Sequence, residues 1–205
     1  MSWSLGETRA LAIKAARGAG LSWGVAEEAG FAVHWLEAHG SPGVQALVRY
    51  LHWRSMPGCD ITPVWSTADQ QGMSAMFCPL ELGAKLQDTG EGSSGHLGWV
   101  RQPLLLAPFL TASGPYRLIW ADTSILIAAH GMTTPAETQS LLIEHADCRL
   151  EKANQEVPAE PLSRRVSTAE AAHMILLEAF AARTYAPATE QSRLAGAGAG
   201  LRDND

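Results

Sequence analysis

The residues best suited to chemistry lie between Arg17 and Glu28, in the stretch RGAGLSWGVAEE. A glycine-rich turn that runs into a helix N-terminus exposes free N–H groups, to which an anion can bind. Arg17 adds a bidentate donor for a carboxylate or phosphate, and Trp23 adds an apolar wall. A partly desolvated Glu27 or Glu28 would serve as a general base. The alternative is an ordinary turn between two helices, in which the glutamates only favour the positive end of the helix dipole.

Residues 186–205 are a second candidate region. The run GAGAG at 196–200 suits close packing of backbone in a narrow groove. In the functional interpretation, this tail folds over a cleft and supplies Arg193, Asn204 or Asp205 to it. The alternative is a solvated terminus.

The histidines and cysteines do not form a metal motif. His52, Cys59, Cys78 and His96 are suitable ligand types, but they lack C-x-x-C or H-E-x-x-H spacing. His130, after an apolar run, is interpreted as a structural histidine. The sequence has no nucleophile elbow, P-loop or dinucleotide-binding motif. We therefore expect neither a metal nor an organic cofactor.

Composition narrows the class of protein. The chain has 205 residues, a net charge of −6, 46% apolar and 18% charged residues, which is typical of a globular protein. We expect one domain over residues 1–205, with no nucleic-acid partner because basic residues do not cluster. No apolar run is long enough to span a membrane, and no secretory signal is visible. Three widely spaced cysteines favour free thiols in the cytoplasm.

Three helices are predicted to pack as an antiparallel unit over residues 1–55. Serines are placed to cap all three helices: Ser4, Ser22 and Ser41. Glu7 completes a capping box with Ser4, and Pro42 lies in the first turn of the third helix. The residues placed to end the first two helices are glycines: Gly18, Gly20 and Gly40. Five tryptophans lie before residue 66, and we interpret them as packing this unit against the next segment. The alternative is a platform that binds a sugar or an aromatic ligand.

The rest of the chain predicts an α+β fold, with an N-terminal helical unit, a central antiparallel sheet, a C-terminal helix and an extended tail. Residues 56–98 are interpreted as loop-rich, with one helix at 79–88. Residues 99–153 predict short antiparallel strands at 104–110, 116–121, 125–129, 141–144 and 148–152. The strand at 125–129 is apolar on both faces and is placed centrally. A last helix is predicted over 167–185, capped by Ser167 with Glu170.

The chain resembles an uncharacterised bacterial family, found mainly in proteobacteria and known as a domain of unknown function. The segments that carry the resemblance are SLGE at 4–7, AARGAGLSWG at 15–24 with Glu27 and Glu28, and GAGAGLRDND at 196–205. The resemblance implies a soluble bacterial single-domain protein. It implies no activity and no catalytic residues.

Two functions remain open, and the absence of a catalytic motif favours the first slightly. The first is a non-catalytic binding or accessory protein of bacterial small-molecule metabolism, such as a partner of a metabolic enzyme. The second is a cofactor-independent lyase, isomerase or hydrolase, which grips a small anionic substrate with Arg17 and Arg193 and moves a proton with Glu27 or Glu28. The enzyme predicts a partly buried glutamate with a raised pKa in a cleft. The binding protein predicts an exposed apolar patch instead. A homodimer fits both.

Overall fold

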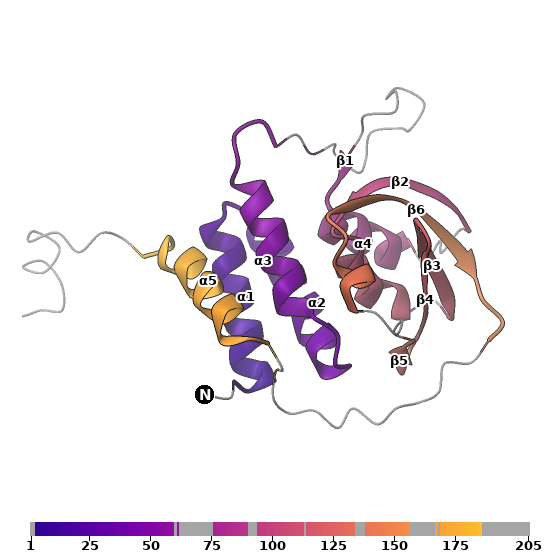
Figure 1. Ribbon diagram of the computed structural model, residues 1–205, viewed down its shortest axis with the longest axis horizontal. Helices are drawn as coiled ribbons and strands as arrows, with labels where there is room; N and C mark the ends of the chain where they lie inside the picture. Colours follow the sequence, from indigo (N-terminus) through magenta and orange to yellow (C-terminus); the bar gives the residue numbers. More distant parts are fainter. Residues whose placement is uncertain are drawn as a thin grey trace, which may run out of the picture.

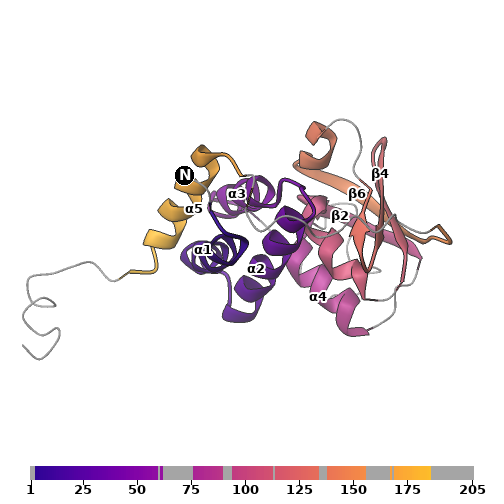
Figure 2. The same cartoon turned by 90° about the horizontal axis from the view of Figure 1, so that it is seen from below.

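The computed structural model describes residues 3–59, 61, 76–89, 94–112, 114–133, 138–155, 167 and 169–185. Its elements form a helical half and a sheet half that lie side by side (Figures 1 and 2). The α+β class is confirmed, because helices come first, a mostly antiparallel sheet follows and a helix comes last. The predicted tail, with Arg193 and Asn204, lies outside the described residues. Among the described helices, none is long and apolar enough to cross a membrane.

The helical half consists of α1 (Leu5–Gly18), α2 (Trp23–Ala38), α3 (Gly43–Arg54) and α5 (Ala171–Ala182). The first three are the helices predicted within residues 1–55. Alanines make α1 and α2 pack closely, and those with no exposed surface are Ala12, Ala15, Ala16, Ala26, Ala29 and Ala32. α5 comes from the far end of the chain and packs against α1 and α3 (Figure 1).

The sheet half contains six described strands in the order β1-β2-β6-β3-β4-β5. Their bounds are β1 (Met76–Phe77), β2 (Gly95–Arg101), β3 (Tyr116–Trp120), β4 (Thr123–Ala128), β5 (Gly131–Met132) and β6 (His145–Lys152). β1 pairs with β2 in parallel, and all other neighbours pair antiparallel. β6 therefore inserts between β2 and β3, although it follows both in the chain.

Two elements join the halves: α4 (Pro79–Thr89) and the 3₁₀ helix η2 (Pro103–Thr111). η2 contacts α2, α3 and α4 as well as strands β3, β4 and β6. Every residue from Pro103 to Leu110 is buried. One hydrophobic core therefore runs from the helical half through η2 into the sheet.

The predicted caps of the first two helices are confirmed. Ser4 and Glu7 form the reciprocal capping box, and Ser22 accepts a hydrogen bond from the Val25 N–H. Gly20 and Gly40 lie just beyond α1 and α2 with φ of +88° and +72°, a conformation that glycine adopts without strain. Gly18 is different, because it is the last residue of α1 and serves close packing rather than chain reversal.

The predicted caps of α3 and α5 are wrong. Pro42 is the N-cap of α3 without a side-chain cap, and the Val44 N–H donates to Glu37 Oε1 at 3.0 Å instead. Glu170 is the N-cap of α5, whereas the Ser167 hydroxyl donates to the other oxygen of Glu37 at 2.8 Å. The buried carboxylate of Glu37 in α2 thus accepts a hydrogen bond at the start of α3 that the spacing assigned to Ser41, and it also holds Ser167 ahead of α5.

Two predicted strands are wrong, and a third is misplaced. Residues 104–110 form η2, because Pro103 and Pro108 have no N–H to donate to a ladder and the run is buried on all sides. Residues 141–144 overlap a second 3₁₀ helix, η3 (Thr138–Leu142). β4 is next to the short edge strand β5, whereas β6 and β3 lie at the centre. A continuous apolar run does not distinguish these possibilities.

Candidate functional site

Arg17 and Trp23 pair with each other in the turn between α1 and α2. The Arg17 guanidinium lies 4.6 Å from the centre of the Trp23 ring, and its Nη1 donates to the Leu21 carbonyl. Trp23 is 65% exposed. These contacts hold the turn and commit Arg17 to the protein itself, as an ordinary helix connection requires.

Glu27 and Glu28 line a separate hollow between α2 and α4. Its volume is about 330 Å³, and its lining residues are Arg9, Glu27, Glu28, Phe31, Ala84, Gln87 and Asp88. Arg17 and Trp23 do not line it. The structure therefore brings the two predicted glutamates together with Asp88 and Arg9. The residues predicted to bind an anion, Arg17 and Trp23, lie outside this hollow.

Glu28 has an unusual environment in this hollow. Partial burial raises the pKa of its carboxyl group, and the nearby charges of Asp88 and Glu27 raise it further. A carboxyl group with a raised pKa can exchange a proton closer to neutral pH. Three carboxylates face one guanidinium here, however, and this balance repels an anionic substrate.

The thiols are bonded or buried. Cys59 donates to the Arg54 carbonyl at 2.9 Å, and Cys78 lies 3.0 Å from the Tyr50 hydroxyl. Burial raises the pKa of Cys78, and it raises that of Cys148 to about 12. A thiol with a raised pKa is a poor nucleophile at neutral pH.

The histidines of interest are also dispersed. His96 pairs with Asp147 at 2.5 Å on the exposed face of β2 and β6, and His130 is an exposed residue after β4. In the described ranges, no three His, Cys, Asp or Glu side chains gather as metal ligands.

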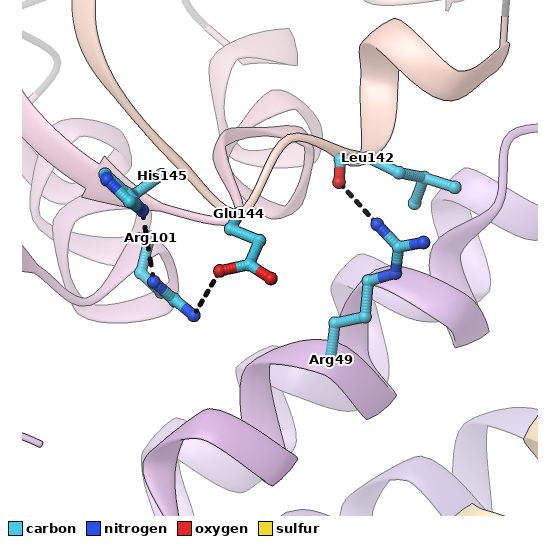
Figure 3. A network of polar contacts seen from close by, with 5 residues as sticks. All are labelled: Arg49, Arg101, Leu142, Glu144 and His145. Atoms are coloured by element: carbon cyan, nitrogen blue, oxygen red, sulfur yellow. Dashed lines mark hydrogen bonds and ion pairs between the residues drawn. The ribbon is translucent and has the colours of Figure 1, made fainter.

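A polar cluster that sequence reasoning missed lies where the two halves meet. We call it the arginine junction: Arg49, Trp53, Arg101, Gln102, Glu144 and His145. Arg49 from α3 and Arg101 from the end of β2 both point toward the segment from Leu142 to His145 (Figure 3). Arg49 Nη1 donates to the Leu142 carbonyl at 2.7 Å.

Arg101 is the centre of the junction. Its Nη2 lies 3.2 Å from Glu144 Oε2, and its Nη1 lies 3.2 Å from His145 Nδ1 (Figure 3). The Trp53 ring stacks on the guanidinium with 4.6 Å between centres. The Arg101 side chain is only 10% exposed, whereas that of Glu144 is 69% exposed. Burial lowers the pKa of Arg101, and Glu144 partly opposes this shift.

Some buried polar atoms of the junction have no partner. Arg101 Nε and both amide atoms of Gln102 make no hydrogen bond within the described residues. Gln102 also has φ of +46°, a left-handed conformation that a side chain other than glycine seldom adopts. Unpaired buried groups and backbone strain cost free energy and often coincide with functional sites. The signal in the sequence is the polar pair Arg101-Gln102 directly before Pro103 and an apolar run.

A wider hollow of about 600 Å³ lies at the β3–β4 turn and the end of β6. It is shallow and open, and its charged side chains include Arg117, which is bonded to Gln155 at 2.9 Å. Because its charged groups stay in solvent, this hollow is a weaker candidate than the arginine junction.

Comparison with known proteins relates the first part of the chain to a family. No curated protein and no solved structure matches the chain. Residues 3–84 match the model of a family described as a protein of unknown function, DUF3726, which confirms the resemblance to a family of this kind. These residues hold α1, α2, α3, β1 and the first half of α4, but not Arg101, Gln102 or Glu144. Over residues 3–84, which are less than half of its length, the chain is therefore similar to the DUF3726 family.

Proposed function

We propose that this chain is a non-catalytic binding protein of small-molecule metabolism, which holds a small anion at the arginine junction. The observation that carries the proposal is the incompletely paired guanidinium of Arg101 beside the unpaired amide of Gln102. An accessory role beside a metabolic enzyme belongs to the same class, and the three free thiols favour a cytoplasmic setting.

Glu144 acts in this proposal as an internal substitute for the ligand. Its carboxylate contacts Arg101 at 3.2 Å but is largely in solvent, so it can leave at little cost. A ligand carboxylate or phosphate takes its place and can bind the guanidinium with two hydrogen bonds. Trp53 holds the guanidinium plane in position for this exchange.

The test is binding of small metabolic anions, measured by thermal shift and then by calorimetry. We expect Arg101→Gln to abolish binding and Glu144→Gln to tighten it about threefold to tenfold, because the competing carboxylate is removed. Arg149→Gln is the matched control, since Arg149 is an exposed arginine on β6. Equal losses in the Arg101 and Arg149 variants, or weaker binding by the Glu144 variant, would contradict the proposal.

The second candidate is a cofactor-independent lyase, isomerase or hydrolase at the hollow of Glu27 and Glu28. The raised pKa of Glu28 favours it. In this alternative Glu28 transfers the proton, and Arg17, Trp23, Arg193 and Asn204 hold a small anionic substrate after rearrangement. Once a ligand is known, turnover should fall at least about a hundredfold in Glu28→Gln and little in Glu27→Gln. Turnover that survives in the Glu28 variant rules this alternative out.

A further inference from the structure

α5 is apolar on both of its faces. Met174, Leu177 and Phe180 are buried against the helical half, as expected for a packed helix. On the opposite face, Ile175 is 63% exposed and Leu176 is 47% exposed. The neighbouring exposed residues of this outer face are Ala172, Ala179 and Ala182. A helix that is apolar all round is normally covered on all sides.

No other described element covers the outer face of α5. In both views α5 lies at the end of the helical half that is farthest from the sheet (Figures 1 and 2). Its main contacts with other described elements are with α1 and α3, on the inner side. A second molecule can therefore reach the outer face without meeting the sheet half.

The spacing on this face is that of a two-stranded helix pair. Ala172, Ile175, Ala179 and Ala182 follow one another at intervals of three, four and three residues. Alanines let two helix backbones approach closely, and Ile175 fills the space between them. Two exposed charged residues flank the stripe on opposite sides, and they are Glu178 and Arg183.

We propose that the outer face of α5 binds a second copy of this chain, with the two helices parallel. In a parallel pair, a flanking residue faces the residue five positions further along on the other helix. Glu178 of each copy therefore meets Arg183 of the other, and symmetry makes this pair twice. In an antiparallel pair the two Glu178 side chains share one flank and repel each other. The charges thus select the parallel dimer.

Arg183 lies beside the stripe, but its guanidinium contacts the inner side of α5. It lies 4.5 Å from the centre of the Phe180 ring, and its Nη1 is 3.5 Å from Ser55 Oγ. The proposed dimer requires this side chain to exchange these contacts for Glu178 of the second copy. The residue remains exposed, and Glu178 is exposed as well. This inference concerns assembly and does not depend on ligand binding at the arginine junction.

The first experiment measures the dimer dissociation constant of the full chain by sedimentation equilibrium. Glu178→Arg and Arg183→Glu should each weaken the dimer about tenfold, since each turns two ion pairs into two repulsions. The double variant restores opposite charges and should return to near the wild-type value. A double variant weaker than both single variants, or a wild-type chain that stays monomeric, overturns the proposal.

A charge on the stripe provides the second test. Ile175→Glu should weaken the dimer about a hundredfold or more, because it buries two carboxylates in the interface. Trp99→Glu is the control, as Trp99 is 39% exposed and lies on β2 in the sheet half. Far-ultraviolet circular dichroism should show both variants folded. A dimer that survives Ile175→Glu, or that is lost equally in Trp99→Glu, uses another surface.

Disulfide trapping tests the direction of the helices. In a Cys59→Ser background, Ala172→Cys and Ala182→Cys should each form a disulfide with its own kind in the parallel dimer. Disulfides that form only when the two variants are mixed show an antiparallel pair and overturn the proposal. The proposal is also overturned if a chain that ends after Tyr185 dimerises while the full chain stays monomeric. Residues 186–205 would then be the occupant of this face.

Discussion

Burial decides which ionisable side chains of this protein have shifted pKa values. Glu27 and Glu28 are neighbours in sequence, but Glu27 is exposed and Glu28 is half-buried beside Asp88. Arg101 is likewise set apart from Arg49 by the Trp53 ring and the end of β2. Neither distinction follows from residue type, and both determine what the side chain can do.

Glu28→Gln should change the pH dependence of stability. Because the pKa of Glu28 is raised from 4.5 in the folded state, its ionised form is disfavoured there, and folding loses stability as pH rises through this pKa. The substitution should increase the free energy of unfolding at neutral pH by less than about 1 kcal/mol, since solvent screens a half-exposed group. At pH values well below 4.5 it should have no effect, because both states are then protonated.

Urea unfolding at both pH values measures this, with Glu151→Gln as the control, because Glu151 is an exposed carboxyl group on β6. Asp88→Asn and Glu27→Gln should each reduce the pKa shift of Glu28, because both charges contribute to it. A gain from Glu28→Gln that is the same at acidic and neutral pH would mean that the gain is not electrostatic.

Gln102→Met should stabilise the fold and weaken anion binding at the same time. Methionine nearly matches glutamine in shape and removes two buried polar atoms that lack partners, so we expect a gain of about 1–2 kcal/mol. Thermal and urea unfolding measure the gain, and calorimetry measures the binding. Gln102→Glu is a useful contrast, because a buried carboxylate would neutralise Arg101. A loss of stability in Gln102→Met would show that the amide has a partner.

At the level of elements, glycines set the closest approaches between helices. A Cβ at Gly18 of α1 would lie 1.9 Å from the Phe180 carbonyl oxygen of α5. One at Gly83 of α4 would lie 2.2 Å from the Phe109 ring of η2. These two contacts fix how α5 and η2, both distant in sequence, dock onto earlier helices.

Gly18→Ala should therefore destabilise the protein by about 2 kcal/mol or more, because backbone atoms must move to admit the methyl group. Gly6→Ala in the same helix meets nothing within 4 Å and should be neutral or stabilise by up to about 1 kcal/mol. Chemical denaturation of the two variants gives a direct comparison. Equal effects would show that helix propensity, and not the contact with α5, controls position 18.

At the level of the whole molecule, the last described helix completes the packing of the first helices. α5 packs on α1 and α3, and the backbone N–H of Ser167 donates to the Trp3 carbonyl at 2.9 Å. Glu37 of α2 binds both Val44 at the start of α3 and Ser167 before α5. η2 packs against both halves and so connects the core of the helices with that of the sheet.

A chain that ends after Gln155 should lose cooperative unfolding of the helical half, because the faces of α1 and α3 that α5 covers become exposed. Circular dichroism during heating measures this loss, with a chain that ends after Tyr185 as the control. For the same reason, residues 3–84 alone should not fold stably. A truncation after Gln155 that melts like the control would show that α5 is peripheral to the fold.

The sequence predicted what neighbouring residues decide. Ser4 with Glu7 and Ser22 before Val25 begin their helices through contacts three residues away, so their spacing is a sufficient signal. The β3–β4 hairpin and the helix at 79–88 were predicted for the same reason. The cap of α3 was missed, because Glu37 lies seven residues away on another helix.

The candidate site shows the same division. By itself the sequence determined the α+β class, the positions of most helices, the β3–β4 hairpin and the absence of familiar catalytic motifs, because these depend on periodicity and local contacts. Only the tertiary structure separated Arg17 from Glu28, turned the apolar run at 104–110 into η2 and brought Arg49 to the segment beside Arg101. Burial and charge balance arise when distant segments share one volume, and no spacing along the chain encodes which segments those are.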